Sequence, residues 1–173
     1  MSRGSTNIYL IGHRGVGKST VAPLAAKLLN RPFIDLDVEI ERNAGAPIHS
    51  IFAVRGESEF RELEAAALAT TADASGLLVA TGGGLVLRED NRKRLRDGFC
   101  IWLRATPTTI IDRLQKGGRP PLTKMTLEGE TTALLAVREP LYQSLAESVI
   151  DVNGLTCQEV AERIQAAVSA KLR

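Results

Sequence analysis

Short apolar runs alternate with longer amphipathic segments along the chain, and this alternation predicts its secondary structure. The apolar runs are four or five residues long, as in buried strands. They predict strands at Ile8–Ile11, Pro32–Asp35, Leu77–Ala80, Phe99–Leu103 and Ser148–Asp151. The remaining segments predict helices at Lys18–Leu29, Val38–Ala44, Glu59–Thr71, Glu89–Arg96, Pro107–Gln115, Thr126–Leu145 and Cys157–Leu172.

Local signals mark the ends of some predicted helices. Thr106 before Pro107 is typical of an N-cap residue followed by a proline at the first helical position. Thr156 and Glu159 have the spacing of a capping box. Pro140 lies inside a long helical segment and is expected to break or kink it, because proline lacks the backbone N–H that an interior position needs.

The order of the elements predicts an α/β protein. Each strand is separated from the next by a helix of crossover length, so we expect a parallel sheet with helices on both faces. The 173 residues suffice for one domain with a substantial core, and no repeat or long linker divides them. Ligands of such sheets bind beyond the carboxyl ends of the strands, which is where candidate chemistry is expected.

Composition narrows the class of protein. The chain is 44% hydrophobic and 24% charged, as in ordinary globular proteins. Its 22 basic and 20 acidic side chains give a net charge of +2, too near neutral to indicate a nucleic acid or membrane partner. We find no apolar run near the roughly 18 residues of a membrane span and no room for a signal peptide in Met1–Asn7. Cys100 and Cys157 are expected to be reduced thiols of a cytoplasmic protein.

A glycine-rich loop follows the first predicted strand. Residues 12–20 read GHRGVGKST and have the spacing of a phosphate-binding loop between a strand and a helix. Its backbone N–H groups and the helix N-terminus favour phosphate, Lys18 supplies a cation, and Ser19 offers a hydroxyl to Mg²⁺. Arg14 either contacts ATP or faces solvent. The candidate ATP-binding residues of this loop are Gly15, Val16, Gly17, Lys18, Ser19 and Thr20.

The next two strand ends also carry candidate chemistry. Asp35 and Asp37 follow the second strand, where one could hold a metal ion and the other meet an attacking hydroxyl. Alternatively, Asp37 simply caps the following helix. The third strand ends in the triplet Gly82–Gly84, which indicates a place where ligand or backbone approaches closely. That strand lacks a terminal Asp, so Asp35 is the leading candidate ligand for Mg²⁺.

Two arginines stand out in predicted helices. Arg61 has acidic residues at positions 57 and 64, so it forms either surface ion pairs or a binding site. A cation in the first turn of a helix is not stabilised by the helix dipole. This favours a functional role for Arg61 beyond surface ion pairs. Arg138, close to Pro140, is either a fixed binding residue or a solvated side chain.

A third arginine lies in a loop rich in glycine and proline. Residues 116–123 read KGGRPPLT, which is typical of a mobile lid in which glycines adjoin a stiff proline segment. A lid of this kind would bring Arg119 to the transferring phosphoryl group and to ATP. The alternative is an ordinary surface loop.

Six motifs together resemble the shikimate kinase family along nearly the whole chain. They are the phosphate loop, Asp35-x-Asp37, Gly56-Glu57-x-x-Phe60-Arg61-x-x-Glu64, Gly82-Gly83-Gly84, Arg119-Pro120 and Arg138-x-Pro140-Leu141-Tyr142. The resemblance implies a transferase that uses ATP to phosphorylate the 3-hydroxyl of shikimate, toward chorismate and the aromatic amino acids. It implies a three-layer α/β/α P-loop kinase fold with a central five-stranded parallel sheet, a substrate-binding region at about 36–64 and a lid at about 115–127.

The resemblance also implies roles for individual residues. Arg61 and Arg138 would hold the shikimate carboxylate, and Gly83 would contact the substrate through its N–H. Asp37 would bind the ring hydroxyls and accept the proton. Two guanidinium groups suit a carboxylate because each can form a bidentate pair with it.

The catalytic and metal-binding residues follow in the same way. Lys18 and Arg119 would supply positive charge to phosphoryl transfer beside Asp37. Ser19 would bind Mg²⁺, with Asp35 nearby. Adenine should lie near residues 153–155, but no side chain there is assigned to it. The prolines of the lid depart from the family's usual Arg-Pro-Leu-Leu, so the length and closure of the lid stay open.

The expected protein is a single P-loop kinase domain over residues 1–173, a monomer whose partners are shikimate and ATP with Mg²⁺. Two alternatives remain. One is another P-loop small-molecule kinase, acting for example on gluconate or a nucleotide; Arg61 and Arg138 discriminate here, since a neutral substrate would not need both. The other is a non-catalytic ATP-binding module, which would not need Lys18, Asp35, Asp37 and Arg119 together.

Overall fold

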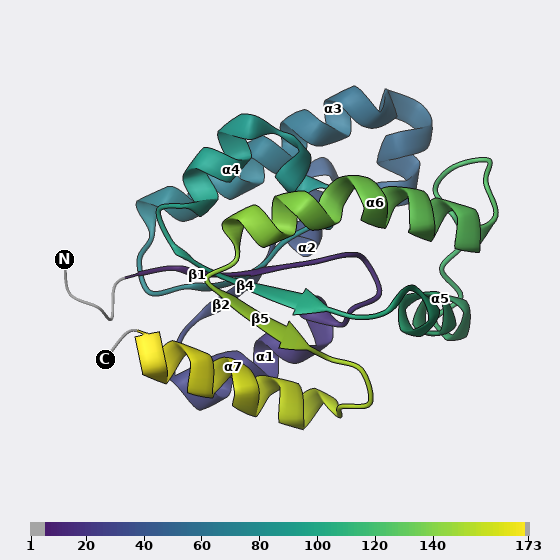
Figure 1. Cartoon of the computed structure of the whole chain (residues 1–173). Helices are drawn as coiled ribbons and strands as arrows, with labels where there is room; N and C mark the ends of the chain where they lie inside the picture. The colour runs from purple at the N-terminus through teal and green to yellow at the C-terminus, as the bar shows by residue number, and fades with distance from the viewer. Residues whose placement is uncertain (1–5, 172–173) are drawn as a thin grey trace.

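The computed structural model describes residues 6–171 and contains one sheet with helices on both sides (Figure 1). The strands are β1 Ile8–Ile11, β2 Phe33–Asp35, β3 Leu78–Ala80, β4 Phe99–Arg104 and β5 Ser148–Asp151. The α-helices are α1 Lys18–Leu29, α2 Leu36–Ala44, α3 Ile48–Thr70, α4 Glu89–Leu95, α5 Pro107–Lys116, α6 Leu127–Leu145 and α7 Cys157–Lys171. Short 3₁₀ helices are η2 Thr71–Asp73 and η3 Leu85–Leu87.

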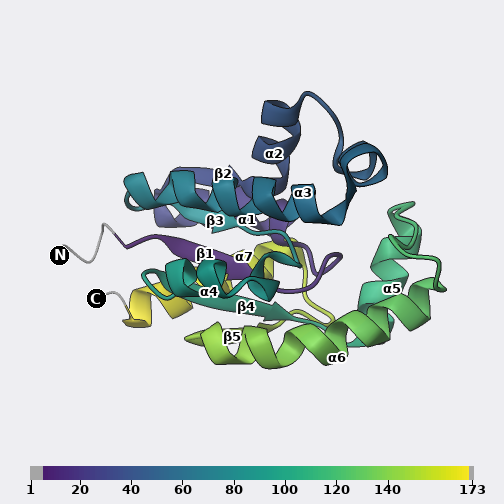
Figure 2. The same ribbon diagram turned by 90° about the horizontal axis from the view of Figure 1, so that it is seen from above.

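The sheet is parallel throughout, with the strand order β2-β3-β1-β4-β5. Helices α1 and α7 cover one face, while α3, α4 and α6 cover the other (Figures 1 and 2). The three-layer α/β/α prediction is therefore confirmed. Because all strands point the same way, their carboxyl ends meet along one edge, where the loops after β1, β2 and β3 come together.

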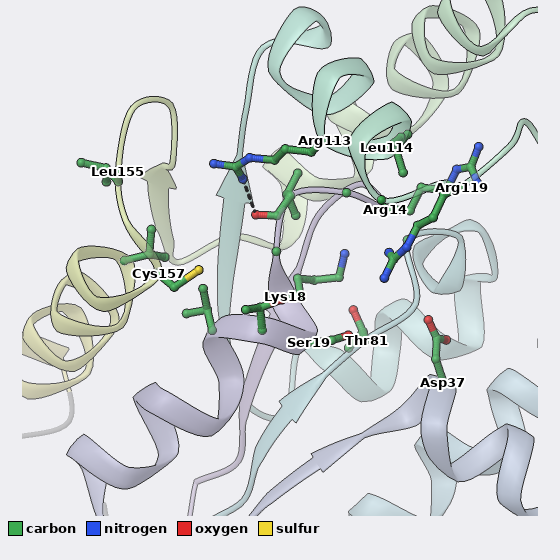
Figure 3. A pocket seen from close by; sticks show the side chains of 18 residues that line it. Arg14, Lys18, Ser19, Asp37, Thr81, Arg113, Leu114, Arg119, Leu155 and Cys157 are labelled. Atoms are coloured by element: carbon green, nitrogen blue, oxygen red, sulfur yellow. Dashed lines mark hydrogen bonds between the residues drawn. The ribbon is translucent and has the colours of Figure 1, made fainter.

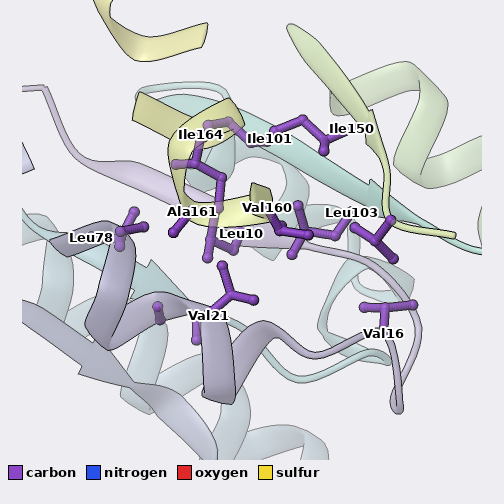
Figure 4. Close-up of a cluster of buried hydrophobic side chains, with 14 of the residues drawn as sticks. Leu10, Val16, Val21, Leu78, Ile101, Leu103, Ile150, Val160, Ala161 and Ile164 are labelled. Atoms are coloured by element: carbon purple, nitrogen blue, oxygen red, sulfur yellow. The ribbon is translucent and has the colours of Figure 1, made fainter. Parts of the chain in front are cut away.

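Alternate residues of the central strand point into two separate cores. Ile8 and Leu10 pack with residues of α1 and α7, including Val160 and Ile164 (Figure 4). Tyr9 and Ile11 lie in the core on the opposite face. Burial on both faces explains why the strand is a continuous apolar run, and it holds the strand ends rigidly in place.

Most predicted elements are confirmed with bounds within two residues, including both N-terminal signals. The Thr106 side chain accepts a hydrogen bond from the N–H of Thr109 at 3.3 Å. In the capping box, Thr156 accepts from the N–H of Glu159 at 3.2 Å, and Glu159 accepts from the N–H of Thr156 at 2.8 Å. The predicted end of the last helix at Leu172 lies outside the described residues.

The predicted break at Pro140 is wrong. Helix α6 continues through this residue to Leu145, and its buried side chains include Leu135 before the proline and Tyr142 after it. Packing on both sides of Pro140 favours the helix over its local cost. Pro140 and Ala136 are exposed, so water can satisfy the carbonyl that the proline leaves without a donor.

The helical residues before Gly56 were not predicted. Helix α3 begins at Ile48, well before the predicted start at Glu59. Gly56 interrupts it with a φ of 82° and a ψ of 170°, so two helical segments meet there at a bend. Among the helices of residues 6–171, none combines the length and the apolar character needed to cross a membrane.

Candidate active site

The loop between β1 and α1 lines a cavity of about 410 Å³ at the carboxyl edge of the sheet (Figure 3). All six loop residues predicted to bind ATP belong to its lining. Gly15 and Gly17 have φ angles of 83° and 101°, a region that favours glycine, and Gly17 is the N-cap of α1. The loop therefore delivers the N-terminus of α1 to the cavity.

Lys18 is buried at the start of α1 and folds back over the loop. Its Nζ donates hydrogen bonds to the carbonyl oxygens of Gly12 at 2.6 Å and His13 at 2.9 Å. Burial lowers the pKa of Lys18 to about 8, while the charges of Asp37 and Asp35 oppose this shift. The ammonium group is thus held where phosphates of a bound nucleotide could replace the two carbonyls.

Asp35 and Asp37 have different surroundings. Asp35 is the N-cap of α2, because its Oδ1 accepts from the N–H groups of Asp37 at 3.0 Å and Val38 at 3.4 Å. The alternative in which Asp37 caps this helix is therefore wrong. The Asp37 carboxylate instead lines the cavity, and burial together with the charge of Asp35 raises its pKa to about 6.

The glycine triplet brings several of these groups together. A Cβ atom on Gly82 would lie 2.5 Å from Glu64 Oε1 and 3.0 Å from Asp37 Oδ1. A Cβ atom on Gly84 would overlap the Arg61 guanidinium. These contacts leave no room for side chains, which confirms that the triplet marks a close approach rather than a plain turn.

Arg61 forms both ion pairs expected from its spacing. It donates to Glu57 at 3.0 Å and to Glu64. Glu64 is buried, which raises its pKa, although the charge of Arg61 opposes that shift. Arg61 is only 16% exposed, so this group is more than a solvated surface pair, and a carboxylate arriving at Arg61 would meet an already ordered cation.

Arg138 is 7% exposed, and the interpretation as a solvated side chain is wrong. Its Nη1 would lie 3.4 Å from a Cβ atom placed on Gly83. Its Nε is buried and has no hydrogen-bond partner within residues 6–171. An unpaired buried donor beside the triplet is a candidate contact for an anion.

The cavity unites most of the predicted site residues. Asp37, Gly83 and Arg119 line it with the phosphate loop, whereas Arg61, Arg138 and Asp35 are not among the residues that line it. The first two of these adjoin the triplet, which itself contributes Gly83 to the cavity.

Sequence reasoning placed adenine near residues 153–155 but missed Arg113 and Cys157 at the end of the cavity farthest from Asp37. Leu155 and Cys157 line that end (Figure 3). Arg113 donates to the carbonyl oxygens of Val16 at 3.0 Å and Val152 at 3.3 Å, so it ties α5 to the phosphate loop and to the end of β5. No local motif marks Arg113, because its position depends on how α5 packs.

The donor set is suited to a magnesium ion held together with phosphates. Ser19 lines the cavity, and the half-buried Asp35 lies outside the lining at the N-cap of α2. Within the part of the chain that the structure describes, no group of three or more His, Cys, Asp or Glu side chains forms a metal cage. Magnesium usually needs no such cage, since it takes one or two protein oxygens with substrate phosphates and water.

A phosphate loop between β1 and α1, with Lys18 at the cavity and a carboxylate facing it, defines a P-loop kinase. Comparison with known proteins narrows this class. A family model described as "Shikimate kinase" matches residues 14–169. The chain belongs to the shikimate kinase family.

Individual proteins agree with this assignment. A shikimate kinase of Thermodesulfovibrio yellowstonii is 44% identical over 160 residues, which cover 91% of this chain and 92% of the relative. One of Symbiobacterium thermophilum is 42% identical over 162 residues, covering 91% and 93%. The structure of an Acinetobacter baumannii shikimate kinase in complex with shikimate is 36% identical with a TM-score of 0.90, covering 98% of this chain and 96% of that one.

Proposed function

We propose that this protein is a shikimate kinase, which transfers the γ-phosphoryl group of ATP to the 3-hydroxyl of shikimate. The products are shikimate 3-phosphate and ADP, in the biosynthesis of chorismate and the aromatic amino acids. One observation carries the proposal. A single cavity has a complete phosphate loop and Asp37 in its lining, and the glycine triplet beside it contacts the half-buried Arg61 and the buried Arg138.

The substrate end is built for a small carboxylated alcohol. Arg61 and Arg138 bind the carboxylate, since guanidinium groups match its planar geometry. Asp37 accepts hydrogen bonds from ring hydroxyls, and the Gly83 N–H donates to the substrate. A neutral polyol, which has no carboxylate, would leave both arginines without an anion, and this favours shikimate over neutral substrates.

The nucleotide end is built from the phosphate loop and the opposite part of the cavity. Backbone N–H groups of residues 15–20 bind the phosphates. Arg113, fixed by two carbonyl groups, and the apolar side chain of Leu155 flank the place left for adenine. The sequence assigned no side chain to adenine, and the contacts of Arg113 and Leu155 are part of the proposal.

Catalysis requires positioning and charge neutralisation more than covalent chemistry. Asp37 orients the attacking hydroxyl and takes its proton late, because a loose transition state demands little activation of the nucleophile. Lys18 and Arg119 stabilise negative charge on the transferring group. Ser19 and Asp35 would hold Mg²⁺, which supplies further charge neutralisation on the phosphates when it is bound with ATP.

A coupled assay of ADP release tests the proposal. Purified protein with ATP and Mg²⁺ should release ADP only when shikimate is present, while gluconate and nucleoside monophosphates should give background rates. ADP release that did not depend on shikimate, or a clear preference for another acceptor, would contradict the proposal. A single kinase domain that acts as a monomer in the cytoplasm belongs to the same proposal, and a sedimentation measurement checks the monomer.

A further inference from the structure

Arg14 belongs to the phosphate loop, but its side chain reaches the lid. Its Nη1 donates a hydrogen bond to the carbonyl oxygen of Pro120 at 3.1 Å. Its Nη2 forms an ion pair with Glu130 Oε1 at 2.6 Å. The side chain is 17% exposed and Arg14 also lines the cavity, so the solvent-facing role considered for Arg14 is wrong, while contact with ATP stays a prediction.

Glu130 connects this arginine to the second half of the lid. It lies in the first turn of α6 with its side chain 1% exposed, and its Oε2 accepts from the backbone N–H of Thr123 at 2.6 Å. Burial alone would raise the pKa of Glu130, but the hydrogen bonds from Thr123 and the charge of Arg14 lower it below its ordinary value. The carboxylate is therefore ionised, and both of its oxygens hold a charge-assisted hydrogen bond.

These bonds hold the stretch of the lid that directly follows Arg119. Pro120 directly follows Arg119, and the next residue is also a proline, so this stretch has few accessible conformations. The backbone N–H of Arg119 donates to the carbonyl oxygen of Leu114 at 2.9 Å, and Arg14 holds the carbonyl of Pro120. The backbone from which Arg119 extends is therefore held on both sides. Arg119 itself lines the cavity, on the same side as the phosphate loop that carries Arg14.

We propose that Arg14 is a positioning residue that fastens the lid to the phosphate loop, through Pro120 and Glu130, and so places Arg119 for phosphoryl transfer. This inference rests on the proposed function, because it assigns Arg119 to that reaction. Arg14 acts through Arg119 and not on the substrate. A misplacement of about 1 Å in such a group can cost on the order of 100-fold in rate.

Steady-state kinetics of Arg14 variants provide the first test. Arg14→Ala should lower kcat at least about 10-fold while the KM values for shikimate and ATP stay within about twofold, as expected for an interaction that matters in the transition state. Arg14→Lys should recover only part of kcat, because one ammonium lacks the fork that reaches both partners. Lys93→Ala is the control, since Lys93 pairs with Glu89 on the exposed surface of α4 and should behave as wild type.

The variant Glu130→Gln distinguishes a role of Arg14 in holding the lid from a direct role in binding ATP. It should lower kcat like Arg14→Ala, and the double variant should be about as slow as either single variant, because both changes release the same fastening. If Arg14 acted on ATP directly, Arg14→Ala would raise the KM for ATP and Glu130→Gln would leave kcat intact. Either result, or additive losses in the double variant, overturns the inference.

Limited proteolysis measures how well the lid is held in place, independently of enzyme activity. Trypsin should cut after the exposed Lys124 several-fold faster in Arg14→Ala than in wild type, at an unchanged melting temperature. Equal cleavage rates would overturn the inference. If the wild-type enzyme failed to phosphorylate shikimate, the proposed function would fall, whereas the cleavage experiment would still decide whether Arg14 holds the lid.

Discussion

The hydroxyl of Tyr142 donates a hydrogen bond to the carbonyl oxygen of Gly83, with 2.5 Å between the two oxygens. Tyr142 is fully buried, and burial raises the pKa of its phenol above the ordinary value, so the hydroxyl remains a donor. Arg138 lies one turn earlier on α6. One helix therefore positions both the arginine and the backbone of the triplet that it contacts.

Tyr142→Phe tests this arrangement. We expect the KM for shikimate to rise several-fold, because the Gly83 peptide loses the bond that orients it, and the stability to fall by about 1 kcal/mol. Tyr9→Phe is the matched control, since the hydroxyl of buried Tyr9 shares a 3.2 Å hydrogen bond with Thr71 away from the cavity. A similar rise in KM in both variants would refute a specific role for Tyr142.

Arg61→Ala should raise the KM for shikimate far more than the KM for ATP, because the variant loses a cation for the substrate carboxylate. Arg113→Ala should do the reverse, because Arg113 lies with the phosphate loop at the other end of the cavity. Arg55→Ala is the control, as Arg55 pairs with Glu59 on the exposed part of the same helix as Arg61. Initial rates over both substrate concentrations separate these effects, and equal changes in both KM values for Arg61→Ala would contradict its assignment.

Asp37→Asn should lower kcat by at least about 100-fold, since the amide cannot accept the proton. In the wild type, whose Asp37 has a pKa of about 6, kcat/KM for shikimate should fall as the pH drops through about 6, because the protonated carboxyl no longer accepts. The measurement is a pH–rate profile from 5 to 8. A variant with nearly normal kcat would exclude Asp37 as the base.

The same substitution should stabilise the free protein. Between the ordinary pKa of 3.8 and about 6, the folded state binds the proton of Asp37 more tightly than the unfolded chain, so the free energy of unfolding decreases as pH rises through this window. Above pH 6 the full cost of the buried charge is present. Thermal unfolding of Asp37→Asn at pH 7 should therefore occur about 2–4 °C higher than in wild type, with little difference near pH 4.

Lys18→Ala should abolish turnover, because a charge on the transferring phosphates is lost. Lys27→Ala, on the exposed side of the same helix, should retain wild-type rates. Because the pKa of Lys18 is about 8 in the free protein, kcat/KM for ATP should also decline as the pH rises above about 8. Measurable shikimate-dependent ADP release by Lys18→Ala would count against the assigned role.

The sequence determined the elements and the chemistry that depend on neighbours along the chain. The apolar runs located all five strands. For β1 and β3, which are buried throughout, the reason is that a strand buried on both faces tolerates few polar side chains. The phosphate loop and the two N-caps were likewise readable, because their hydrogen bonds join residues only a few positions apart.

Only the tertiary structure decided relations between distant segments. It brought Asp37 to the cavity, placed Arg113 near the phosphate loop, and joined Arg14 to Glu130. In the structure α6 also continues past Pro140, where the sequence predicted a break or kink. Packing between helices and sheet fixes these contacts, and a chain read residue by residue contains no local signal for partners that lie about a hundred positions apart.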